Sequence, residues 1–101
     1  MKNLVIVSFP AKAEKLDVLK DAMKDALPET RAYDGCRSVD TYIEESTNTI
    51  HLIEDWESLD HQARYLKWRV ETGLLTALDP MLDGGSASIK VILCGQKELK
   101  I

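Results

Sequence analysis

Apolar residues follow two different periods along this chain, and the period indicates which segments form strands and which form helices. The stretch from Leu4 to Phe9 is almost continuously apolar and rich in β-branched residues, which is typical of a strand buried on both faces. From Ala13 to Thr30, apolar residues recur at steps of three and four with charged residues between them, as in an amphipathic helix. The pattern predicts six elements: strand 4–9, helix 13–30, strand 38–43, strand 50–56, helix 59–72 and strand 88–94.

Turn and capping residues indicate where these elements begin and end. Pro10 follows the first strand, and Pro28 is expected to end or kink the first helix, because proline has no N–H to continue the hydrogen-bond ladder. Residues 46–49 have the sequence of a turn and join two strands into a hairpin. Ser58 is a candidate N-cap of the second helix, and Gly73 can end that helix.

The order strand–helix–strand–strand–helix–strand predicts an α+β fold of the ferredoxin-like type. Such a fold has an antiparallel four-stranded sheet, here of order 4-1-3-2, with both helices on one face. The chain has 101 residues, which suits one domain spanning residues 1–101, since two cores of half that size would bury too little apolar surface. Cys36 and Cys94 would then lie on opposite edges of the sheet, too far apart for a disulfide bond within one chain.

Apolar residues on both sides of the central strand predict a second covering layer. Leu4 and Ile6 alternate with Val5 and Val7, so one of these two sets faces away from the helices. A monomer that exposed this set would carry a large apolar patch. We therefore expect a homodimer in which the sheets of two copies pack face to face about a two-fold axis.

The second helix has more apolar and aromatic surface than packing on one sheet requires. Its predicted core face consists of Leu59, Ala63, Leu66 and Val70. His61, Tyr65 and Trp68 form a third side, between this face and the charged one. Three candidates could cover it: the short apolar segment 74–82, a partner subunit, or a bound small molecule.

Composition and charge narrow the function classes. With 45% hydrophobic and 30% charged residues, the chain resembles an ordinary globular protein. Its net charge of −4 and its lack of a basic run disfavour nucleic acid binding. The apolar stretches are too short for a membrane span or a signal peptide, so we expect a cytoplasmic protein. Neither a dinucleotide or phosphate loop nor a metal-ligand motif is present, so we expect no cofactor and no metal.

The candidate chemical groups lie in and just before the second helix. His61 shares a helical face with Tyr65 and Arg69, which would place a base beside a phenol and a cation. Each residue also has a structural interpretation: a surface or packing histidine, a buried phenol, and an arginine paired with a nearby carboxylate. Trp56 and Trp68 could stack on an aromatic ligand or fill space between sheet and helix.

The run from Ile53 to His61, Ile-Glu-Asp-Trp-Glu-Ser-Leu-Asp-His, follows Gly35-Cys36 and the hairpin. In this arrangement the chain resembles the antibiotic biosynthesis monooxygenase (ABM) family, including its quinol monooxygenase members. The resemblance implies a dimeric α/β barrel of ferredoxin-like subunits. It also implies oxidation of electron-rich aromatic compounds by molecular oxygen without flavin, haem or metal, with Trp56 and His61 at positions that match the family's Trp and first His.

The resulting hypothesis is a cofactor-independent monooxygenase that acts on a small hydroxylated aromatic, a quinol or an anthrone-like polyketide. His61 would deprotonate the substrate, Trp56 and Trp68 would stack on its ring, and Tyr65 or Arg69 would stabilise the oxyanion. Two alternatives remain open: a non-oxidative isomerase or lyase of the same fold, and a non-catalytic dimeric protein that binds a small molecule.

Overall fold

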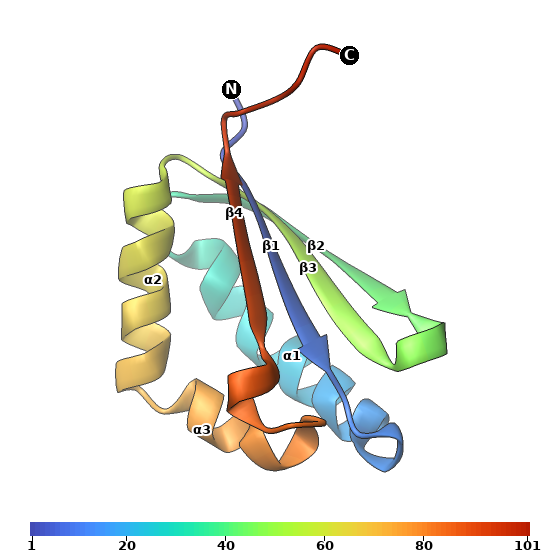
Figure 1. Ribbon diagram of the computed structural model, residues 1–101. Coiled ribbons are helices and arrows are strands. Elements are labelled where there is room, and N and C mark those ends of the chain that lie inside the picture. Colours follow the sequence, from blue (N-terminus) through green and yellow to red (C-terminus); the bar gives the residue numbers. More distant parts are fainter.

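The computed structural model describes residues 1–101 and contains a four-stranded antiparallel sheet with its helices on one side (Figure 1). The strand order β2-β3-β1-β4 is the predicted order 4-1-3-2 viewed from the other edge, so the predicted topology is confirmed. The main elements are β1 (Leu4–Pro10), α1 (Leu16–Ala32), β2 (Cys36–Glu44), β3 (Thr49–Trp56), α2 (Leu59–Glu71), α3 (Leu74–Leu78) and β4 (Lys90–Gly95). Short 3₁₀ turns connect them: η1 (Ala13–Lys15), η2 (Glu45–Thr47), η3 (Asp79–Met81) and η4 (Ser86–Ser88).

Helix α1 continues past Pro28 and ends at Ala32, so of the two predicted effects of Pro28, an end or a kink, the end is excluded. Pro28 lies on the exposed side of the helix. Because proline has no N–H, the carbonyl of Lys24, one turn earlier, loses its usual partner, and water can hydrate it there. On the opposite side, the next turn is held by Leu27 and Thr30, which are both buried. Packing therefore outweighs the hydrogen bond that proline removes.

The core lies between the sheet and the helices, as the two-residue period of the strands requires. In β1, Val5, Val7 and Phe9 are buried, and Leu52 and Trp56 of β3 lie on the same face. Leu19 and Met23 of α1 and Leu78 of α3 belong to the same core cluster.

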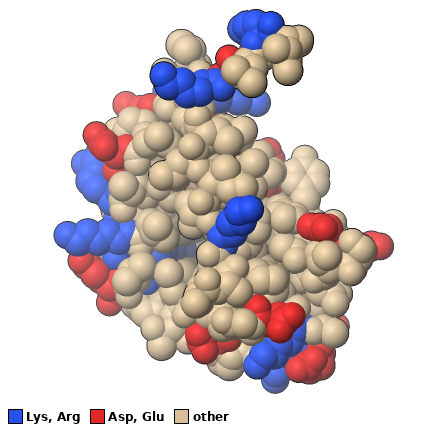
Figure 2. All heavy atoms as spheres, viewed as in Figure 1, with Lys and Arg blue, Asp and Glu red and all other residues tan.

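The opposite face of the sheet has no covering element. Leu4 and Ile6 of β1, Ile53 of β3 and Ile92 of β4 face this side, together with the exposed Tyr42 of β2. The face seen in Figure 2, over β4 and β1, is largely uncharged, with most Lys, Arg, Asp and Glu side chains nearer its margin. Cys36 and Cys94 lie on the two edge strands as free thiols, as predicted.

Helix α2 is rotated relative to its prediction. Its buried residues are Gln62, Tyr65 and Arg69, whereas Ala63 and Val70 of the predicted core face are exposed. The long polar side chains can face inward because α1 provides hydrogen-bond partners for them, as described below. None of the helices has the length and apolar composition of a membrane-spanning segment.

Candidate functional site

A mostly apolar cavity of about 200 Å³ lies between the helices and the sheet. Its walls come from β1, β3, the three helices and the segment before β4, and include Val7, Phe9, Leu52, Leu66, Leu78 and Ile89. Its polar lining residues are Thr30 of α1, Glu54 of β3, Ser86 of η4, and Gln62, Tyr65 and Arg69 of α2. The cavity thus combines apolar walls with a small set of polar groups, which is typical of small-molecule sites.

Glu54 is the most unusual of these residues, because it is an acidic residue with only 2% of its surface exposed. In the sheet it lies between Val5 of β1 and Val39 of β2, both of which are buried. This apolar environment raises the pKa of the Glu54 carboxyl by desolvation. Trp56 partly offsets the effect, since its Nε1–H donates a hydrogen bond of 2.9 Å to Glu54 Oε1.

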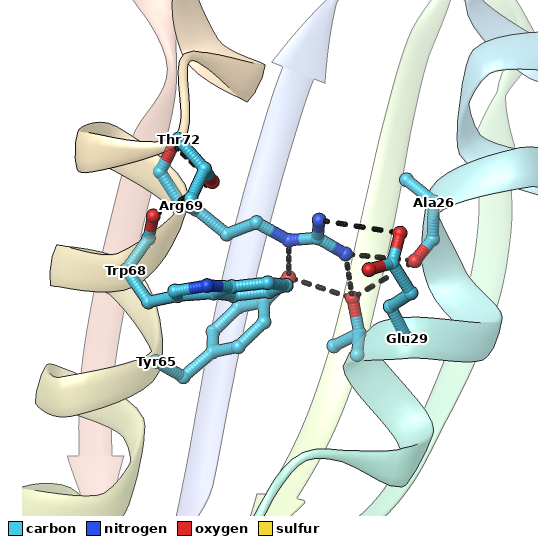
Figure 3. A network of polar contacts seen from close by, with 7 residues as sticks. Ala26, Glu29, Tyr65, Trp68, Arg69 and Thr72 are labelled. Carbon is cyan, nitrogen blue, oxygen red and sulfur yellow. Dashed lines mark hydrogen bonds and ion pairs between the residues drawn. The ribbon is translucent and has the colours of Figure 1, made fainter.

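Arg69 places a buried guanidinium between α2 and α1 (Figure 3). Its Nε donates to Tyr65 Oη at 2.8 Å, and its Nη2 donates to the Ala26 carbonyl at 2.7 Å and to Thr30 Oγ1 at 3.1 Å. Tyr65 Oη and Thr30 Oγ1 are themselves 2.6 Å apart. The Trp68 ring lies under the guanidinium, with 4.6 Å between Cζ and the ring centroid, which adds a cation–π contact.

Gln62 is the cavity residue whose side chain remains available to a ligand. The residue is buried, and its side-chain amide forms no hydrogen bond within the chain. Every side-chain N or O atom that is completely enclosed has a hydrogen-bond partner, so the Gln62 amide is not completely enclosed. Because Gln62 lines the cavity, this amide offers it a donor and an acceptor that no other side chain uses.

His61 lies outside this cavity, at the start of α2. Its Nδ1 is 2.7 Å from Oγ of Ser58, the N-cap residue, and its Nε2 is 3.7 Å from Glu57 and 3.8 Å from Asp34. The ring packs so closely on Gly35 that a Cβ there would lie 2.3 Å from it. The geometry places His61 in the packing of the helix start against the turn before β2, away from Tyr65 and Arg69.

The other predicted residues are divided between the cavity and its support. Tyr65 and Arg69 line the cavity, as the stated hypothesis requires. Trp56 is fully buried behind Glu54, and its ring packs against Tyr65 with 5.2 Å between centroids. Trp68 packs between Arg69 and Tyr33, so neither tryptophan presents a face to the cavity.

Sequence reasoning missed Glu54 and Gln62. A signal for Glu54 was available, because it shares the inward parity of Leu52 and Trp56 in strand 50–56. Gln62 precedes Tyr65 by three residues and Arg69 by seven, so it belongs to the same helical face once that face is known to be buried. No group of three or more His, Cys, Asp or Glu side chains is arranged to hold a metal ion.

The fold and cavity define a class: a ferredoxin-like α+β domain that encloses a ligand-sized, mostly apolar pocket beneath its helices. The chain belongs to the antibiotic biosynthesis monooxygenase family, whose model matches residues 4–69, from β1 into α2. A comparison with curated proteins gives no match.

Solved structures share the fold at low sequence identity. Protein SO0527 from Shewanella oneidensis is 17% identical, with a TM-score of 0.75 over 94% of this chain and 91% of that one. Rv0793 from Mycobacterium tuberculosis is 24% identical, with a TM-score of 0.68 over the full length of both chains. A structure described as an antibiotic biosynthesis monooxygenase is 18% identical, with a TM-score of 0.75 over 89% of this chain and 93% of that one.

Proposed function

We propose that this protein is a cofactor-independent monooxygenase that oxidises a small hydroxylated aromatic with molecular oxygen. Family membership supports the reaction class. The observation that carries the proposal is the buried Glu54 carboxyl, which lines an otherwise apolar cavity beside a free amide and a buried cation. Such a cavity can accept a ring, remove a proton from it and stabilise the resulting anion.

The size of the cavity favours a substrate with one ring. An apolar cavity of about 150 Å³ holds one benzene molecule, and the cavity here measures about 200 Å³. A quinol fits this volume, whereas a three-ring anthrone would need α3 or the neighbouring segment to move. We therefore favour the quinol over the anthrone-like polyketide.

Glu54 replaces His61 as the proposed base. A carboxylate whose pKa is raised is a stronger base than an ordinary one, and it lies where a substrate hydroxyl can reach it. Gln62 would hydrogen-bond the phenolate oxygen and the charge of the buried Arg69 guanidinium would stabilise the anion, while the apolar walls exclude water. The electron-rich anion then reduces oxygen: one oxygen atom enters the ring, the other leaves as water, and the quinol becomes a hydroxyquinone.

Oxygen uptake with single-ring quinols tests this proposal, measured against uncatalysed autoxidation and with the product identified by mass. We expect Glu54→Gln to lower kcat by about 100-fold or more, since this is the usual contribution of a general base. Glu71→Gln, on the exposed side of α2, is the matched control and should retain full activity.

The His61→Ala variant distinguishes the two candidate bases. Loss of turnover in His61→Ala with full activity in Glu54→Gln would restore His61 as the base. Absence of uptake with every quinol would contradict the oxygenase proposal. Anaerobic conversion of a substrate would then favour an isomerase or lyase, and saturable binding without product would favour a binding protein.

We also propose that two copies associate through the open face of the sheet. The support is the apolar strip formed by Leu4, Ile6, Ile53 and Ile92, which no element of the chain covers. Association through this face would leave the cavity on the outer, helix-covered side of each sheet.

A further inference from the structure

A second hollow lies on the other side of α1 from the cavity. It is a groove of about 420 Å³ between α1 and the outer strands β2 and β3. Its apolar floor is formed by Met23 and Leu27 of α1, Ile43 of β2 and Ile50 of β3, with Thr41 beside them.

The groove exists because α1 covers only the first part of β2. Val39 faces the helix and is buried, whereas Thr41 and Ile43, which face the same way further along the strand, are exposed. In Figure 1 the hairpin of β2 and β3 extends beyond the helices, which leaves this inner strip of the sheet open.

Positive charge gathers along one wall of the groove. Lys20, Lys24 and Arg31 of α1 line it, at steps of four and seven residues, and no acidic residue does so in a chain with net charge −4. None of the three takes part in an ion pair of the structure. Arg31 donates from Nε and Nη2 to the Val39 carbonyl, which leaves its Nη1 without a partner.

We propose that this groove binds a small organic anion with an apolar body and a single anionic head, such as a carboxylate. The apolar floor matches the body, and the unneutralised cations match the head. At nearly three times the volume of about 150 Å³ that holds a benzene ring, the groove has room for a body of two or three rings or a medium-length alkyl chain. A polyanion would gain nothing from this floor, and a neutral aromatic would gain nothing from the cations. This groove is separate from the proposed oxygenase cavity, and a ligand could bind in it whether or not the cavity is an oxygenase site.

Anilinonaphthalene sulfonate is a suitable fluorescent probe, and N-phenylnaphthylamine has a closely similar apolar body without the charge. We expect the double variant Lys20→Gln, Lys24→Gln to raise the Kd of the sulfonate about fivefold or more, because it removes two exposed charge contacts. The Kd of the neutral compound should change less than about twofold, because its binding involves no charge contact. The matched control is Arg64→Gln with Lys67→Gln, which removes two charges from the exposed side of α2 and should leave both Kd values unchanged.

A second pair of variants tests the floor. Ile43→Glu places a carboxylate in the groove and should abolish sulfonate binding, whereas Val18→Glu, at an exposed position of α1 outside the groove, should not. Competition by naphthoate or by decanoate would then show whether the accepted body is aromatic or aliphatic.

Four results would overturn the proposal: unchanged affinity in the groove variants, loss of affinity in the control variants instead, competition by neither carboxylate, or a fall in bound probe per chain as protein concentration rises. The last result would mean that a second copy of the chain fills the groove.

Discussion

Glu54 shows how the environment of one residue changes its chemistry. In strand 50–56 the inward-facing positions carry apolar residues apart from Glu54, which therefore lies among buried valines. Its raised pKa follows from this desolvation. The parity of the strand could have revealed this acid from the sequence, whereas the presence of Gln62 in the same cavity could not, because tertiary packing alone brings the two residues to that cavity.

Ionisation of Glu54 has a consequence for stability that can be measured without a substrate. Because the pKa of Glu54 is higher in the folded state, the folded protein holds this proton more tightly, and the resulting stabilisation is lost as the pH rises through the folded pKa. We expect Glu54→Gln to remove this loss. The difference in Tm between variant and wild type should therefore shift in favour of the variant from pH 5 to pH 8, as followed by circular dichroism. A constant difference would mean that Glu54 has an ordinary pKa.

The orientation of α2 is decided by residues on another element. Arg69 and Tyr65 face inward because Thr30 and the Ala26 carbonyl of α1 accept or share their hydrogen bonds. The predicted core face included Val70, which is exposed, whereas Arg69, predicted to share a different face with Tyr65, is buried.

Two substitutions on α2 test this orientation. Arg69→Met removes a buried, charged hydrogen-bond network and should lower the free energy of unfolding by about 2–3 kcal/mol. Val70→Ala, at a position that is 55% exposed, should cost less than about 1 kcal/mol. Urea denaturation measures both. A larger cost for Val70→Ala would support the helix face expected from sequence.

The elements differ in how far they could be predicted. Strand period, the hairpin turn and the Ser58 cap depend on neighbouring residues, so the sheet order and the start of α2 follow from local pattern. The persistence of α1 beyond Pro28 depends on packing with distant residues. The same holds for His61, whose ring is held by Ser58 and by Gly35, in a turn more than twenty residues earlier.

At the scale of the whole molecule, the proposed dimer can be tested by the mass of the protein in solution. The wild type should sediment at about twice the chain mass of 11.4 kDa. Ile6→Glu should sediment as a monomer, because a carboxylate would be buried in the apolar interface without a partner. Val70→Glu, on the helix side, is the control and should remain dimeric. A wild type that stays monomeric at every concentration would exclude association through the sheet.

The alternation of burial along β1 and β3 also has an evolutionary consequence. Val5, Val7, Leu52 and Glu54 face the core and the cavity, while their immediate neighbours Ile6, Ile53 and Asp55 face the open side. Adjacent codons are therefore subject to different selective pressures, one from the pocket and the other from whatever meets the open face. A lineage could change its ligand through one set of positions and its mode of assembly through the other, with little interference between them.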